Sequence, residues 1–172
     1  MLRGIPGVLE RFWDMFVVDA FLKNPDRNNG NWGILMADGE YSLAPVYDLG
    51  SSLFSKRASD VAAERMEDRS AMEQDALSTN VSCYRLVDER GGSQAIHLFE
   101  YMASTDNPDL RAAIHRFVDA VDMDAVDSII DEVPEEAYGT ILLSGRMRES
   151  HKRLLRMRYE EGFLPLSSSM TT

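Results

Sequence analysis

Residues 24–50 read N-P-D-R-N-N-G-N-W-G-I-L-M-A-D-G-E-Y-S-L-A-P-V-Y-D-L-G, and this stretch decides the fold that we expect for the chain. Its first part is rich in Asn, Asp and Gly, which form turns readily and helices poorly. The apolar run at 33–36, the Asp-Gly pair at 38–39 and the run at 41–44 predict two short strands joined by a tight turn. The stretch is therefore expected to be a polar loop, a β-hairpin and a second, acidic loop.

The hairpin is expected to return the chain to its starting point, where three oxygen-bearing side chains meet. Asp26 and Asn31 come from the first loop and Asp48 from the second. Phosphoryl transfer needs this combination, because one carboxylate orients the acceptor hydroxyl while an amide and a second carboxylate hold Mg²⁺ against the nucleotide phosphates. We therefore predict Asp26 as the catalytic residue, Asn31 and Asp48 as metal ligands, and Mg²⁺ and ATP as the cofactors.

Two simpler explanations exist for this composition. Clusters of Asn, Asp and Gly are most often plain turns, and an isolated D-R-N-N-G-N would be explained in that way. Its spacing, taken together with the second acidic loop, favours the catalytic interpretation. A calcium-binding loop that starts at Asp26 fails on register, because its sixth position is Asn31 in place of Gly and its twelfth is Ala37 in place of Glu.

The two loops together resemble the catalytic loop and the metal-binding loop of the HipA-like kinases. The resemblance is carried by D-R-N-N-G-N at 26–31 and by A-P-V-Y-D-L-G at 44–50, which a Ser-Ser-Leu run follows. A more distant similarity extends to protein kinases and lipid kinases. The similarity is strong over residues 8–54 and is only that of a helical kinase C-lobe beyond them. It implies a mainly α fold with a small β-hairpin, a protein-kinase-like C-lobe, and phosphoryl transfer from ATP to Ser or Thr of a protein substrate.

The same resemblance assigns nucleotide binding or support of the loop to further residues of the first loop, namely Arg27, Asn28, Gly30, Trp32 and Gly33. Arg27 is expected to brace the loop by pairing with a nearby carboxylate, while a plain surface position fits the sequence equally well. Gly30 and Gly33 would permit a tight turn and a close approach of the nucleotide to the backbone.

The composition is that of a globular domain. Of the 172 residues, 44% are hydrophobic and 27% are charged, which indicates neither disorder nor a membrane span. The net charge of −11 argues against generic nucleic-acid binding, which relies on clustered cations. The lone cysteine, Cys83, favours a reducing compartment, and no signal peptide is recognisable. We therefore expect a cytoplasmic protein that does not contact a membrane.

An apolar helix is expected at 8–23, and it should end before Pro25 because the residue that precedes a proline avoids the helical conformation. Residues 55–82 are polar and poor in large apolar side chains, so we expect a partly helical, mobile excursion on the surface. Capping residues and helical periodicity predict further helices in the second half. Their expected ranges are 94–104 after Ser93, 108–120 after Asp106 or Asn107, a helix after Asp122, one that begins at Pro134, and 140–161.

Gly162 is expected to end the last helix, which would leave the Ser/Thr-rich C-terminus frayed. We divide the chain into a kinase C-lobe at 1–166 and a flexible tail at 167–172. Acidic residues gather at 119–136 and basic residues at 146–158, which predicts neighbouring helices with complementary, solvated faces. A docking site for a partner is the less favoured explanation of this charge pattern.

Kinases cover their nucleotide with a Gly-rich loop and a strand of the V-A-I-K type, and neither motif is recognisable in the sequence. We therefore expect a C-lobe without its N-lobe, either as a fragment of a longer kinase or as a subunit completed by a separate N-lobe protein. The alternative is a non-catalytic kinase-like module of a toxin–antitoxin or regulatory system, with an antitoxin-type protein partner. A self-contained small enzyme with another mode of nucleotide binding ranks last.

Overall fold

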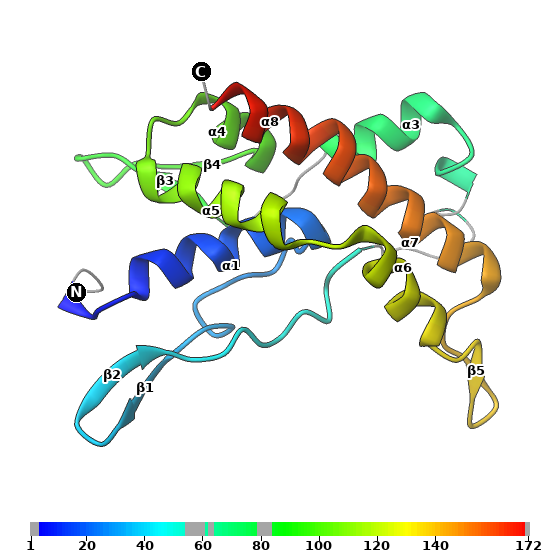
Figure 1. The fold of residues 1–172 in the computed structure, drawn as a ribbon, viewed down its shortest axis with the longest axis horizontal. Coiled ribbons are helices and arrows are strands. Elements are labelled where there is room, and N and C mark those ends of the chain that lie inside the picture. Colours follow the sequence, from blue (N-terminus) through cyan, green and yellow to red (C-terminus); the bar gives the residue numbers. More distant parts are fainter. Residues whose placement is uncertain (1–3, 54–60, 62–63, 79–83, 171–172) are drawn as a thin grey trace.

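The computed structural model describes residues 4–53, 61, 64–78 and 84–170, which form a mainly helical domain with small two-stranded antiparallel sheets (Figure 1). The predicted mainly α fold with a small hairpin is therefore confirmed. The helices are α1 (Val8–Leu22), α3 (Arg69–Glu73), α4 (Leu98–Ser104), α5 (Pro108–Ala120), α6 (Met123–Glu132), α7 (Gly145–Met157) and α8 (Leu164–Ser169), with π-helical segments η2 (Gln74–Ser78) and η3 (Arg158–Phe163). The strands pair as β1 (Ile34–Ala37) with β2 (Glu40–Leu43), β3 (Arg85–Val87) with β4 (Ser93–Ala95), and β5 (Glu136–Ala137) with β6 (Thr140–Ile141).

Helix α1 forms the centre of the main core, and α5 packs along it (Figure 1). Phe16 and Phe21 of α1 are buried, and the Phe21 ring centre lies 5.0 Å from that of Phe117 on α5. The helix ends at Lys23, which adopts a left-handed conformation with φ 54° shortly before Pro25. Both the buried character of this helix and its end are as the sequence predicts.

The β1–β2 hairpin that follows the first polar loop is confirmed. Ile34 pairs with Leu43, and the strands are joined by a two-residue turn. Both turn residues, Asp38 and Gly39, have positive φ (52° and 83°), which is the conformation that an Asp-Gly pair favours in tight hairpins. The hairpin extends away from the helical body at the lower left of Figure 1, and Leu43 is its one buried strand residue.

The structure confirms two predicted helix starts and one predicted pair of neighbouring helices. Asn107 caps α5 through its side chain, with Pro108 in the first turn, and Asp122 caps α6 in the same way. The acidic α6 lies beside the basic α7, and Nη2 of Arg156 is 2.7 Å from Oδ2 of Asp127. The predicted charge complementarity between these segments is therefore confirmed.

Three expected helix starts are wrong, because short hairpins occupy the positions where these helices were expected to begin. The helix predicted from residue 94 begins only at Leu98, because the turn at Gly91 (φ 80°) folds β4 back on β3. No helix begins at Pro134, which leads into the β5–β6 hairpin. As a result, α7 starts at Gly145 and not at 140.

Residues 64–78 contribute to a second, smaller core, which corrects the expected surface excursion. Met66 and Ala76 are buried and pack with Leu154 of α7. The prediction underestimated this segment because methionine and alanine fill gaps between helices without forming a long apolar run. The remaining residues of the 55–82 range, apart from residue 61, lie outside the described part of the chain.

The C-terminal helix does not end at Gly162 as predicted, but continues from α7 through η3 into α8. A Cβ atom at residue 162 would lie 2.5 Å from Cε1 of Phe99 and 3.3 Å from Cδ2 of Leu77. Glycine at this position therefore permits close packing of a continuing helix. Sequence alone does not separate this use of glycine from its use as a helix stop.

The C-terminus is helical up to Ser169, in contrast to the expected frayed tail. Helix α8 contacts α5, where the Ser167 hydroxyl lies 2.8 Å from Nδ1 of His115. Arg111 of α5 also donates to the carbonyl of Met170 at 3.3 Å. The boundary that we expected between 166 and 167 falls within α8, and residues 171–172 lie outside the described part of the chain.

Arg158 departs from the expected solvated basic face. Its side chain is fully buried, its Nε donates to the carbonyl of Ala20 at 2.8 Å, and its Nη1 donates to the carbonyl of Ala76. The guanidinium carbon lies 4.9 Å from the centre of the Phe99 ring. Burial lowers the pKa of Arg158 to about 9. Arg158 thus ties the C-terminal helix to the last turns of α1.

The packing at Gly162 yields a stability prediction. A methyl group placed 2.5 Å from the buried Phe99 ring introduces strain of about 2–3 kcal/mol, at the upper end for an overpacked core. This exceeds the gain of about 1 kcal/mol in helix propensity. We therefore expect Gly162→Ala to lower the free energy of unfolding in urea by about 1–2 kcal/mol.

The matched control is Gly145→Ala in the same continuous helix, where an added Cβ meets nothing within 4 Å. This change should leave the free energy of unfolding unchanged or raise it by up to about 1 kcal/mol. Equal stability gains in both variants would show that Gly162 is not needed for packing.

Candidate functional site

The last turns of α1 place a buried carboxylate beneath the two loops. Asp19 is 0% exposed. Its Oδ1 accepts from Nη2 of Arg27 (2.9 Å) and Nδ2 of Asn24 (2.8 Å), and its Oδ2 accepts from Nε of Arg27 (2.8 Å) and from the Tyr84 hydroxyl (2.7 Å). These four donors match the acceptor capacity of a carboxylate, so a charge that is costly to bury is fully hydrogen-bonded.

Arg27 joins both loops to that carboxylate. It is 4% exposed, and its Nη1 donates to the carbonyls of Asn31 and Tyr47, each at 2.5 Å. The structure therefore places Arg27 in a bracing position, paired with a carboxylate, and not at the surface. The hydrogen bond to Asp19 raises the pKa of Arg27 against the opposing effect of burial, and the charge of Asp48 acts in the same direction. Asp48 thus lies within electrostatic reach of the guanidinium.

The first loop closes on itself through its own side chains. Nδ2 of Asn31 donates to the carbonyl of Asp26 at 2.6 Å, and Nδ2 of Asn28 lies 3.3 Å from Oδ1 of Asp26. The Gly30 amide donates to Oδ1 of Asn28 at 2.8 Å. Asn31 is buried, whereas Asn28 and Gly30 are exposed. The loop therefore brings together Asp26 and Asn31, two of the three residues that the sequence singled out.

The second loop contacts the first on both sides of Asp48. The Tyr47 hydroxyl donates to the carbonyl of Gly30 at 3.0 Å, and the Ser51 hydroxyl donates to Oδ2 of Asp26 at 3.3 Å. Asp48 itself is exposed and has φ 55°, a conformation that Asp tolerates better than most residues. The hairpin thus returns the chain to the first loop, and the two loops lie side by side.

Trp32 and Gly33 connect the first loop to the hairpin, and both are half-buried. The Gly33 carbonyl accepts from the Ala44 amide at 2.8 Å, which extends the β1–β2 pairing by one residue. A Cβ at Gly33 would lie 3.8 Å from the Tyr47 hydroxyl, an ordinary contact, whereas a Cβ at Gly30 would lie 3.1 Å from a side-chain oxygen of its own loop. Gly30 is therefore the more constrained of the two glycines.

Sequence reasoning did not single out Asp19, Asn24 or Tyr84, which complete the buried network. Asp19 carries a recognisable signal, because it is an acidic residue in a helix whose neighbouring side chains are almost all apolar. Such a residue must find partners when it is buried. Tyr84 lies 65 residues further along the chain, and no local pattern links it to Asp19.

We also searched the described residues for a metal site made of protein ligands alone and for membrane-spanning helices. No three Asp, Glu, His or Cys side chains among them gather as a protein-only metal site requires. Over the same ranges, none of the helices combines the length and the apolar character that a membrane crossing needs.

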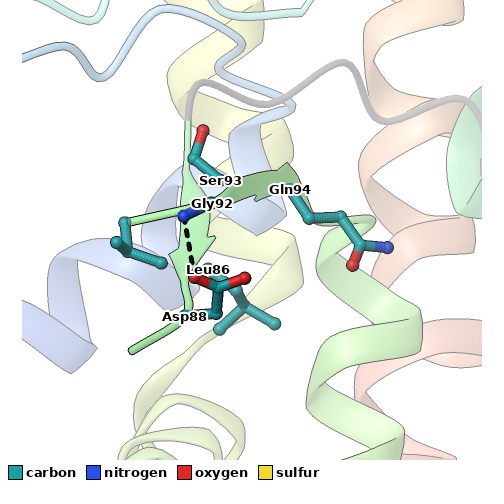
Figure 2. A pocket seen from close by; sticks show the side chains of 6 residues that line it. Leu86, Asp88, Gly92, Ser93 and Gln94 are labelled. Carbon is teal, nitrogen blue, oxygen red and sulfur yellow. Dashed lines mark hydrogen bonds between the residues drawn. The ribbon is translucent and has the colours of Figure 1, made fainter. Parts of the chain in front are cut away.

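The β3–β4 hairpin carries a hollow of about 440 Å³ that is separate in sequence from the two loops (Figure 2). It is lined by Leu86, Val87, Asp88, Gly92, Ser93 and Gln94. Oδ1 of Asp88 accepts from the Gly92 amide at 2.7 Å and from the Arg90 amide at 2.9 Å. The acidic side chain of this hollow therefore stabilises the turn, and we assign the hollow no part in the candidate site.

The buried ion pair beneath the loops generates a prediction. Removing one partner of a buried, hydrogen-bonded ion pair costs about 3–5 kcal/mol. We therefore expect Asp19→Asn to lower the free energy of unfolding by about 3 kcal/mol. Because Arg27 also holds both loops, their amides should exchange with deuterium faster in this variant, which hydrogen-exchange mass spectrometry would measure.

Asp14→Asn is a matched control on the same helix. Asp14 also pairs with an arginine, Arg116, at 2.6 Å, but both side chains are about 40% exposed. Exposed pairs contribute about 0–1 kcal/mol, so this variant should remain close to the wild type. Similar losses in both variants would contradict a special role for the buried pair.

Comparison with known proteins places this site in context. No protein-family model matches the chain. The chain is 35% identical over 159 residues to the serine/threonine-protein kinase CtkA of Helicobacter pylori, an alignment that covers 91% of this chain and 44% of CtkA. The crystal structure of that organism's proinflammatory kinase CtkA matches with a TM-score of 0.80 and 28% identity, over 95% of this chain and 53% of that one.

The chain therefore spans about half the length of the relative that it matches. The sequence comparison and the structure comparison both match CtkA, over 91% and 95% of this chain. The chain is homologous to the serine/threonine kinase CtkA across a region that makes up about half of that kinase.

Proposed function

We propose that the chain is the C-terminal catalytic lobe of a HipA-like kinase, which transfers a phosphoryl group from ATP to Ser or Thr of a protein and requires an N-lobe in cis or in trans. The observation that carries the proposal is the set of Arg27 hydrogen bonds that hold the D-R-N-N-G-N loop beside the Y-D-L-G loop. The homology to CtkA, a serine/threonine kinase, supports the same reaction class.

Asp26 is the proposed catalytic residue, which orients the acceptor hydroxyl and takes its proton. Its Oδ2 accepts a hydrogen bond from the Ser51 hydroxyl at 3.3 Å, so a hydroxyl donor can reach this carboxylate. The backbone of Asp26 is fixed at the same time, because its carbonyl accepts from Asn31. A base held in place in this way needs little reorganisation when a substrate arrives.

Asn31 and Asp48 are the proposed ligands of Mg²⁺. Nδ2 of Asn31 donates to the Asp26 carbonyl, which leaves its Oδ1 as the atom suited to a cation. Asp48 adds an exposed carboxylate from the loop that Arg27 fixes. This small set fits Mg²⁺, which takes one or two protein carboxylates together with substrate phosphates. When bound, Mg²⁺ would neutralise the charge that develops on the phosphates.

The β1–β2 hairpin is the proposed contact surface for the nucleotide and the N-lobe. Leu35, Met36 and Tyr41 are exposed on it, directly after the catalytic loop. Large apolar side chains on a projecting hairpin mark a surface that another element covers. Nucleotide binding or loop support is proposed for the remaining residues of the first loop, namely Arg27, Asn28, Gly30, Trp32 and Gly33.

The need for an N-lobe leads to a binding prediction. Titration calorimetry of the isolated chain with ATP should give a dissociation constant weaker than about 100 µM, because the phosphate contacts of an N-lobe are missing. Residual binding should require Mg²⁺ and should be lost in Asp48→Asn. Tight, Mg²⁺-dependent binding by the chain alone would contradict the requirement for an N-lobe.

Catalysis is tested by adding an N-lobe in trans, or by using a longer natural chain that includes one. Transfer of labelled γ-phosphate to a protein acceptor should fall by about 100-fold or more in Asp26→Asn, the contribution that a general base makes. Asp119→Asn is the control, since Asp119 is an exposed carboxylate of α5 outside both loops and the β1–β2 hairpin. A non-catalytic module would transfer no phosphate in either variant or in the wild type.

A further inference from the structure

A group of apolar side chains is exposed where α6 passes into the β5–β6 hairpin. We refer to these side chains as the α6–hairpin surface, which consists of Ile129, Val133, Tyr138, Ile141 and Leu142. The Leu142 amide donates to the carbonyl of Glu135 at 2.8 Å, which folds the chain after the hairpin back to its start beside the end of α6. The hairpin projects from the helical body at the lower right of Figure 1. Clustered exposed apolar side chains of this kind mark an interaction surface.

Tyr138 gives a second, independent indication. It occupies the first position of a two-residue turn with φ 54°, a conformation that is unfavourable for an aromatic residue, and its relative exposure is 107%. The corresponding position of the β1–β2 hairpin holds Asp38, which tolerates this conformation. The fold gains no packing from the Tyr138 ring, so the strain points to a role outside the fold. Tyrosine is also enriched among the residues that dominate protein interfaces.

The α6–hairpin surface has a negatively charged rim. Residues 117–145 contain no Lys or Arg. The aspartates on the other side of α6 pair with Lys152 and Arg156 of α7. In contrast, Glu132, Glu135 and Glu136 are exposed and form no ion pair within the described ranges. Arg148 of α7 also reaches this end of α6, where it donates to the carbonyls of Ile130 and Val133 and lies 3.9 Å from Oδ1 of Asp131. The exposed apolar side chains are therefore accompanied by three exposed glutamates that have no ion-pair partner among the described residues.

We infer that the α6–hairpin surface docks an apolar segment of another protein that is flanked by Lys or Arg. The exposed apolar side chains of this surface would be buried against the docked segment, and the glutamates favour a basic segment over neutral or acidic ones. A second copy of this chain fits poorly, because a symmetric contact would set the same glutamates against each other and the net charge of −11 adds repulsion. An anionic lipid surface is disfavoured for the same reason. This inference goes beyond the proposed kinase function and does not rest on it.

The test begins with a displayed library of random 12-residue peptides that is selected on the wild-type chain. Binders of a triple variant, Ile129→Ser, Tyr138→Ser and Ile141→Ser, are removed in each round. We expect the enriched peptides to combine Lys or Arg with Leu, Ile or Phe. Failure to enrich any peptide over the triple variant, or enrichment of acidic peptides, would overturn the inference.

Single variants then locate the binding of an enriched peptide by fluorescence anisotropy. Its affinity should fall by about 10-fold or more in Tyr138→Ser or Ile141→Ser, as for an interface anchor. In Glu136→Gln it should fall by about threefold, with a weaker dependence on salt. Val87→Ser on β3 is the control, because Val87 and Ile141 are both 69% exposed and belong to similar short hairpins; it should bind like the wild type.

Two outcomes of this second stage would overturn the inference. One is unchanged affinity in Tyr138→Ser and Ile141→Ser. The other is a wild-type dimer in sedimentation velocity that dissociates in Tyr138→Ser, because the surface would then belong to a second copy of the chain. The replaced side chains are exposed, so unchanged melting temperatures should accompany every variant and separate loss of binding from loss of folding.

Discussion

The buried ion pair between Asp19 and Arg27 is the interaction on which the two loops depend. The loops contain few regular backbone hydrogen bonds, so the carbonyls of Asn31 and Tyr47 are held together by one guanidinium. A guanidinium suits this task because its donors are rigidly spaced and it stays charged when buried. Asp19 fixes Arg27 in turn, and Asn24 and Tyr84 complete the set of donors. Such a fully satisfied network favours one arrangement of the loops over others.

The end of α1 is also held from outside the loops. Arg158 donates to the carbonyl of Ala20, and Nζ of Lys23 lies 3.7 Å from Oδ1 of the buried Asp75. Positive groups are favourable at this end, where the helix dipole is negative. The C-terminal helix and the 64–78 segment therefore both set the position of the turn that carries the candidate site. This arrangement explains why residues distant in the sequence matter to the geometry of the loops.

Sequence reasoning succeeded where the deciding chemistry is local. The Pro25 helix end, the Asp38-Gly39 turn and the Asn107 cap each depend on residues within a few positions of one another, and the structure has all three. Sequence reasoning failed where the contacting residue is far away in the sequence. Nothing near Gly162 in the sequence reveals that it faces Phe99.

In the candidate site, too, contacts between residues close in the sequence could be predicted, and contacts between distant residues could not. The proximity of Asp26 and Asn31 depends on a short loop and could be predicted from it. Arg27 left two alternatives open, because its partner Asp19 belongs to the preceding helix. The contact of Tyr84 with Asp19 depends on the packing of the whole domain, and no single segment of the sequence encodes it. The β5–β6 hairpin was missed for a different reason, since its turn holds a tyrosine where Asn, Asp or Gly would signal a hairpin.

The charge distribution restricts how the proposed site can handle phosphates. Arg27 is the one basic residue in the sequence from 24 to 53, and its donors are directed to Asp19 and two carbonyls. A nucleotide that approaches the loops therefore meets the carboxylates of Asp26 and Asp48 in a chain of net charge −11. Phosphates are repelled there unless positive charge arrives with them. In the proposed function, a divalent cation is thus required for any nucleotide binding, and basic residues of a covering lobe are required for tight binding, before any chemical step.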